Sequence, residues 1–218
     1  MTRFPLKHIT LISISATAAL LPICSGAQRR AQTHTPPAPP PRVRIEIEKR
    51  GVVIAELFRQ KTPKTTAHFI ALVKRHFYDH VLFHSVVKGF MASTGDPKSK
   101  SFNGAKLAGL SELQIAEKYA LGAGSSGSTV PLEPGYDHDR GTLGLQHPRA
   151  NIDAGDCVFF FNLTDNQENY GAYTAFGKVI SGLSVLDKIN QGDRITSIRI
   201  VTSEAELEVK GTRGKVLR

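Results

Sequence analysis

Residues 76 to 85 include the side-chain types that most often do chemistry. His76, His80 and His84 recur at every fourth position, and Ser85 follows His84 directly. This spacing suits metal ligands on one helical face, but the turn signal at 78–80 breaks a helix, and no cysteine or carboxylate pattern completes a site. Neighbouring side chains on a strand point to opposite faces, so His84 and Ser85 cannot pair as base and nucleophile. We therefore predict no metal site and no serine hydrolase.

Several apolar side chains suggest a different kind of site, a pocket that could hold an apolar ring of a ligand. Phe90 and Met91 lie in "GFM", Phe160 lies in "VFFF", and Tyr173 precedes "TAFGKV". By residue type alone, these side chains suit the core of a β-protein as well as a pocket. His138 and His147 are predicted to lie at the surface.

The elements that would carry these residues are mostly strands. In "RVRIEIE" the apolar residues Val43, Ile45 and Ile47 alternate with polar ones, and the "KRG" turn leads into a second strand, 52–58. A helix is predicted over 62–78, with Thr62 as its cap. Its buried face is predicted to hold Ala67, Ile70, Val73 and Phe77. Further strands are predicted over 81–86, 88–94, 142–147, 157–163, 173–180, 195–201 and 205–210, with a second helix over 182–191.

This order of elements predicts a mainly β fold. A barrel capped by two helices would leave few sheet edges unpaired. One segment, about 98–140, interrupts the strands. Its "LSELQIAEKYA" predicts a short helix, and "GAGSSGS" predicts a flexible link that lacks the spacing of a nucleophile elbow. The insertion is either a functional flap or a tolerated loop. We expect the barrel to fold when residues 100–128 are replaced by a short linker.

The N-terminus predicts export. Residues 1–27 have a basic start, an apolar run and small residues at Ser25 and Ala27, as in a signal peptide. Lipidation at Cys24 is the alternative. Residues 28–41 form a proline-rich linker, and 42–218 form the folded domain. After cleavage Cys157 is the one cysteine left, which predicts a buried thiol and no internal disulfide. We expect no transmembrane span after processing.

The charge does not indicate a nucleic-acid partner. The formal net charge is +9, but the lysines and arginines are scattered, without a basic stripe or interleaved aromatics. The composition, 40% hydrophobic and 22% charged, is that of a globular protein.

Four motifs in order carry a family resemblance: "TPKTTAHFIALVKRHFYDHVLFH", "GFM…GDP", "VFFFNLTDN" and "AFGKVISGLSVLDKI". From about residue 43 to 210, the chain resembles a cyclophilin-type peptidyl-prolyl cis–trans isomerase of the exported bacterial kind. The resemblance implies a closed eight-stranded antiparallel barrel capped by two α-helices. It also implies a periplasmic monomer that needs no cofactor and acts on X-Pro bonds of exported polypeptides.

The resemblance assigns roles to individual residues. Ser85 takes the position of the family's catalytic arginine, Ser93 that of the glutamine that orients it, and Val158 that of a second glutamine. Glu168 and Asn169 replace an aromatic residue and a leucine. The implied substrate-binding residues are His84, Phe90, Met91, Ser93, Gln146, His147, Phe160 and Tyr173.

A serine hydroxyl cannot replace a guanidinium, because it is short, neutral and loosely aimed. The leading hypothesis is therefore an isomerase with weakened catalysis at Ser85. The alternative is a chaperone-like module that binds proline-containing segments without isomerising them.

Overall fold

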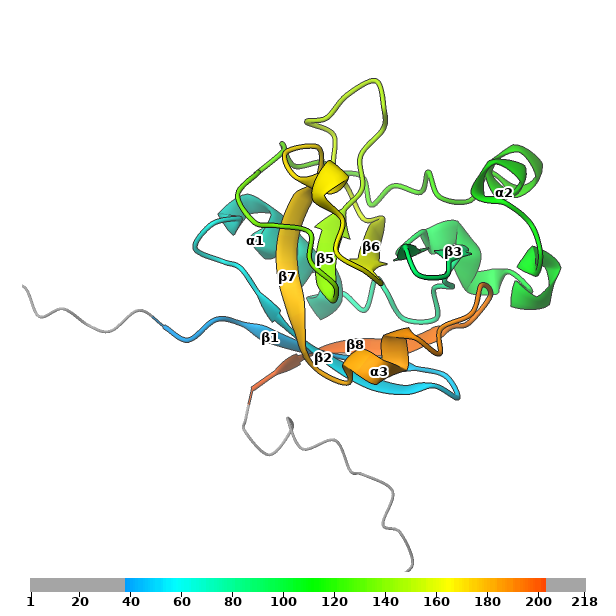
Figure 1. The fold of residues 1–218 in the computed structure, drawn as a ribbon, viewed down its shortest axis with the longest axis horizontal. Helices are drawn as coiled ribbons and strands as arrows, with labels where there is room; N and C mark the ends of the chain where they lie inside the picture. The colour runs from blue at the N-terminus through cyan, green and yellow to red at the C-terminus, as the bar shows by residue number, and fades with distance from the viewer. Residues whose placement is uncertain (1–37, 203–218) are drawn as a thin grey trace, which may run out of the picture. The chain divides into compact units, whose positions relative to one another are not determined.

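The structure is a computed structural model, which describes residues 38–202. Its eight strands form one antiparallel sheet with the order β3-β4-β6-β5-β7-β2-β1-β8 (Figure 1). The predicted mainly β, antiparallel fold is confirmed. The strands are β1 (Arg42–Ile47), β2 (Gly51–Leu57), β3 (Ser85–Val87), β4 (Met91–Thr94), β5 (Thr142–Leu145), β6 (Phe159–Asn162), β7 (Thr174–Ser181) and β8 (Ile195–Val201). The α-helices are α1 (Pro63–Lys74), α2 (Glu112–Tyr119) and α3 (Leu183–Leu186). No helix in this part of the chain is long and apolar enough to cross a membrane.

The sheet curls into a half-barrel, so the expected closure was wrong. Its edge strands β3 and β8 do not pair with each other. They approach through the segment before β3, where an isolated antiparallel bridge joins Leu82 to Arg194 and the Phe83 amide donates to the Asp193 carbonyl at 2.8 Å. β3 begins at Ser85, after this segment, so the two edges meet outside the strand itself.

The β1–β2 hairpin confirms the alternation in the sequence. Val43, Ile45 and Ile47 are at most 2% exposed and belong to the main core. The hairpin reverses at residues 48–50, where Lys49 has a positive φ of 60°. The strand predicted over 205–210, the signal segment and most of the linker lie outside the described residues.

Helix α1 confirms only part of the predicted buried face: Val73 is buried, and Ile70 and Phe77 are partly buried against the core. Ala67 is exposed, and the buried apolar side chains are Phe69, Leu72 and Val73. The aromatic core decides this, because the Phe69 ring meets the rings of Phe159 and Phe176 with centroids 5.4 and 5.0 Å away. Thr62 also differs from the prediction: its hydroxyl bonds the Phe58 carbonyl and caps no helical amide.

The insertion has a small core of its own, at the right of Figure 1, built around Leu82. The predicted helix is confirmed as α2, where Ser111 and Gln114 form a capping box. This third helix was not among the two expected to cap the barrel. The insertion is also tied to the start of β8, because the Arg194 guanidinium donates to the carbonyls of Lys100 and Phe102. The buried members of this second core are Leu82, Leu107, Ile115 and Leu121.

Candidate functional site

The strand register places three predicted site residues in one row. Ser85 lies opposite Ser93 across β3 and β4, and Ser93 lies opposite Phe160 across β4 and β6. Directly opposite residues share a face of a sheet. The neighbours of Phe160 on β6, Phe159 and Phe161, face the main core, so the row lies on the other face.

A second row lies two residues along on the same face. Val87 is opposite Met91, and Met91 is opposite Asn162. The rows touch, since the Ser93 hydroxyl donates to the Met91 sulfur at 3.6 Å. Phe90 lies in the turn before Met91, with 36% of its surface exposed. We call these two rows the groove: Val87, Phe90 and Met91 are at least partly exposed along it, whereas Ser85, Ser93 and Phe160 are at most 2% exposed.

Phe160 forms the floor of this groove, and it is held by Gly144 and His138, neither of which was predicted to belong to the site. Gly144 lies opposite, and a Cβ atom there would sit only 2.2 Å from Cζ of Phe160. The His138 ring stacks against Phe160 with centroids 5.9 Å apart, and the Tyr173 ring meets it edge-on at 5.5 Å. Phe160 is consequently 2% exposed.

His138 is completely buried, so the prediction of a surface histidine was wrong. Its Nδ1 accepts from the Asn162 amide at 3.1 Å, and its Nε2 donates to the Tyr173 carbonyl at 3.1 Å. This pairing fits a neutral imidazole, and burial lowers the pKa of His138. Asn169 donates to Asn162 at 3.4 Å. A polar network therefore backs the floor.

Ser85 and His84 do not form a catalytic pair. His84 is 1% exposed, and neither of its ring nitrogens has a hydrogen-bond partner in the described chain. The ring lies against the insertion, with Nε2 3.2 Å from where a Cβ of Gly122 would be. The structure thus places His84 under the insertion, while Ser85 stays in the groove row.

The burial of His84 predicts an acid-sensitive fold. Desolvation lowers its pKa from 6.5 to about 4, although the nearby Asp96 carboxylate opposes the shift. Because the unfolded chain takes up the proton first, stability falls as the pH drops from about 6.5 towards 4. His84 would account for up to about 3 kcal/mol.

We expect His84→Gln to remove most of this pH dependence in urea unfolding, while His80→Asn, at an exposed histidine, retains it. Equal pH slopes in wild type and His84→Gln would contradict the assignment.

Gln146 and His147 follow β5 and lead away from the floor. The Gln146 amide donates to the Val158 carbonyl at 2.9 Å, and the His147 ring stacks on Tyr173 at 4.8 Å. They line a pocket of about 380 Å³ beside the groove. Its other walls are Gly122, Ala123, Gly124, Ser125, Thr129, Pro148, Arg149, Ala154, Asp156 and Val158.

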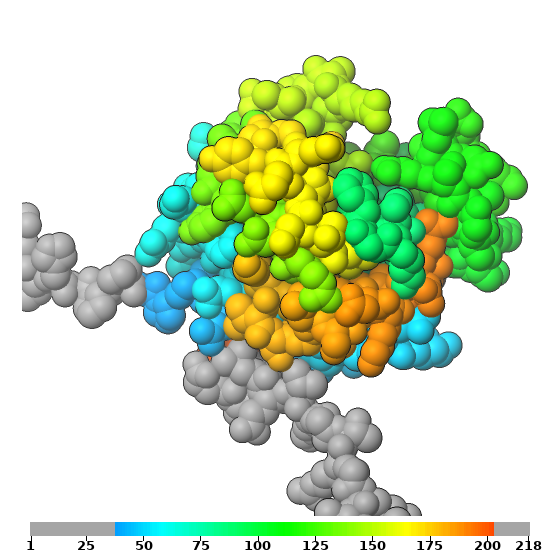
Figure 2. All heavy atoms as spheres, in the orientation of Figure 1, coloured from blue at the N-terminus to red at the C-terminus, as the bar shows by residue number. Residues whose placement is uncertain are grey.

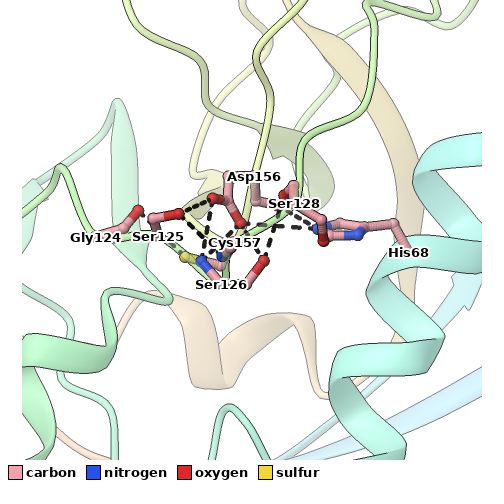
Figure 3. A network of polar contacts seen from close by, with 8 residues as sticks. His68, Gly124, Ser125, Ser126, Ser128, Asp156 and Cys157 are labelled. Carbon is pink, nitrogen blue, oxygen red and sulfur yellow. Dashed lines mark hydrogen bonds and ion pairs between the residues drawn. The ribbon is translucent and has the colours of Figure 1, made fainter.

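Asp156 anchors the segment that forms the opposite wall (Figure 3). Its carboxylate accepts from the Ser125 hydroxyl at 2.6 Å and from the Ser126 hydroxyl at 2.5 Å. His68 of α1 bonds the Asp156 carbonyl at 3.1 Å, and the Cys157 thiol donates to the Gly124 carbonyl at 3.3 Å. The predicted flexible link is therefore held in place. Cys157 is buried as expected, and burial raises its pKa.

The three evenly spaced histidines do not converge. His76 and His80 are exposed and His84 is buried. Among residues 38–202, no group of three or more histidine, cysteine or acidic side chains could hold a metal ion.

An eight-stranded antiparallel half-barrel with short flanking helices is the cyclophilin-like fold. The chain belongs to the cyclophilin-type peptidyl-prolyl cis–trans isomerase family. The family model "Cyclophilin type peptidyl-prolyl cis-trans isomerase/CLD" matches residues 42–205.

Curated relatives agree with this assignment. A peptidyl-prolyl cis-trans isomerase of Helicobacter pylori (strain ATCC 700392 / 26695) is 34% identical over 154 residues, which cover 68% of this chain and 80% of the relative. A probable peptidyl-prolyl cis-trans isomerase of Brucella suis biovar 1 is 32% identical over 188 residues, covering 83% and 85%.

The solved structure of a Cryptosporidium parvum cyclophilin, determined in the presence of the dipeptide Ala-Pro, shares the fold. The TM-score is 0.60 at 23% identity, and the match covers 74% of this chain and 99% of the cyclophilin.

Proposed function

We propose that the protein isomerises X-Pro bonds of exported polypeptides as a monomer, with catalysis weakened at Ser85. The row of Ser85, Ser93 and Phe160 carries this proposal. Rotation about an amide has a barrier of about 18–20 kcal/mol, and X-Pro bonds interchange over tens to hundreds of seconds without help. An apolar floor that holds the proline ring and a donor aimed at the prolyl nitrogen would lower this barrier.

The aromatic residues of the site are retained, whereas the hydrogen-bond donor at position 85 is only a serine hydroxyl. The partly exposed Tyr173, Phe90 and Met91 can contact a proline ring, and the Phe160 ring, 2% exposed, lies against Tyr173. In the row, the Ser85 hydroxyl makes no hydrogen bond to any residue between 38 and 202. Losing one oriented transition-state donor typically lowers a rate by about 10²–10³-fold. We therefore propose slow but measurable isomerisation.

The test is the refolding of a protein whose rate is limited by proline isomerisation. We expect micromolar amounts of this protein to accelerate the slow phase, and Phe160→Ala to remove the acceleration. Because Phe160 is buried, Phe160→Leu is the companion variant, and urea unfolding shows whether each variant folds. A slow phase that stays at its uncatalysed rate at every concentration of wild type would disprove isomerase activity.

A second candidate function is binding of proline segments without turnover. It is favoured by the retention of Phe160 next to the small Ser85 and Ser93 side chains. The structure solved with Ala-Pro supports a proline-containing ligand, since that cyclophilin shares this fold. In this case X-Pro peptides bind weakly and Phe160→Leu binds them less well, although refolding is unchanged. Equal binding by wild type and Phe160→Leu would exclude use of this pocket.

We also propose that the protein is exported to the periplasm, because residues 1–27 have the pattern of a signal peptide. The mass and N-terminal sequence of the mature protein distinguish cleavage after Ala27 from lipidation at Cys24.

A further inference from the structure

The pocket beside the groove lies within reach of a peptide bound on Phe160. Val158, which lines the pocket, is two residues from Phe160 along the chain into β6. Two extended residues span about 7 Å. A peptide whose proline rests on Phe160 therefore brings a side chain about two positions away to this pocket.

Two charged side chains line the pocket, and only one of them is held by hydrogen bonds. Asp156 is saturated by the hydroxyls of Ser125 and Ser126 and by the Ser126 amide. Arg149 is exposed and has no hydrogen bond or ion pair among the residues that the structure describes. The charged group that is left free to bind a ligand here is therefore the Arg149 guanidinium, because the Asp156 oxygens are already occupied by hydrogen bonds.

The backbone that carries Arg149 is held by local bonds. The Asn151 amide donates to the Pro148 carbonyl at 3.0 Å, and the Leu132 amide donates to the Asp153 carboxylate at 3.0 Å. Figure 2 shows this part of the chain, yellow-green, standing at the top of the molecule. A cation on an ordered loop at the rim of a pocket attracts an anion without first ordering the loop.

We propose that Arg149 is a specificity-determining residue that selects peptides with a Glu or Asp side chain about two residues from the proline. This inference rests on the proposed binding of proline peptides in the groove. It concerns selection between peptides, and the isomerisation itself is unaffected. Arginine suits the role because its planar guanidinium binds a carboxylate through two parallel hydrogen bonds.

The test compares labelled peptides that contain one proline and carry Glu, Gln or Lys two residues before or after it. Binding is measured by fluorescence anisotropy at low and at physiological ionic strength. We expect the Glu peptide to bind about two- to five-fold more tightly than the Gln peptide at low ionic strength, in one of the two positions. The difference should shrink at higher salt because the pair is exposed.

Variants identify the residue responsible. Arg149→Gln should bring the Glu-to-Gln ratio to about one, and Arg149→Lys should retain part of the preference. Arg75→Gln, at an exposed arginine after α1, is the matched control and should keep the wild-type ratio. An unchanged ratio in Arg149→Gln overturns the inference, as does tighter binding of the Lys peptide, which would indicate that Asp156 dominates.

A peptide in which Ala replaces the proline distinguishes failure of the proposed function from failure of the Arg149 inference alone. Equal binding of the Ala and Pro peptides, or no binding of any peptide, disproves the proposed function and the inference with it. Selective binding of the Pro peptide with no effect of Arg149 overturns the inference alone.

Discussion

The double variant Ser85→Arg, Ser93→Gln is expected to isomerise X-Pro bonds about 10²-fold faster than the wild type. The register gives the reason. Ser93 lies between Ser85 and Phe160 in one row, so a glutamine at 93 is placed to orient an arginine at 85 toward a proline on Phe160. A fixed guanidinium donor favours the twisted amide, in which the prolyl nitrogen regains its lone pair.

The measurement is the catalysed rate in the proline-limited refolding assay, with urea unfolding to show that each variant is folded. Ser85→Lys, Ser93→Gln is the matched control, because an ammonium ion has the charge without the planar fork. Its rate should rise much less. If the folded arginine variant binds X-Pro peptides but is no faster than wild type, the weakness of catalysis has another cause than the missing donor.

Ile115→Ala is expected to lower the free energy of unfolding by about 2–5 kcal/mol. Ile115 is 0% exposed and packs with Leu82, Leu107 and Leu121 in the small core of the insertion. Leu113→Ala provides the control on the same helix, since Leu113 is 67% exposed and its truncation should cost at most about 0.5 kcal/mol. Urea unfolding measures both.

This prediction reverses the expectation from the sequence that residues 100–128 can be replaced without loss of the fold. Leu82 precedes β3, so removing its partners exposes apolar surface next to the groove strand. The replacement should therefore destabilise the whole domain. If Ile115→Ala and Leu113→Ala unfold at the same urea concentration, the insertion is a loosely attached flap and its core does not support the sheet.

Local patterns in the sequence were enough to predict several elements. The alternation of Val43, Ile45 and Ile47 predicted β1, and "LSELQIAEKYA" predicted α2, because both periods depend only on neighbouring residues. The buried face of α1 was predicted less well. Helical periodicity allows more than one apolar stripe, and contact with the aromatic core selected Phe69 and Leu72.

The candidate site likewise has features that the sequence predicts and features that depend on the tertiary structure. The sequence by itself determined which family motifs are present and that serines stand at positions 85 and 93. Only the tertiary structure decided that these serines lie in line with Phe160, that Gly144 and His138 support that ring, and that His84 lies under the insertion. Strand pairing and burial join residues far apart in the chain, so no local pattern encodes them, and a shift of one residue in register would turn the row to the other face of the sheet.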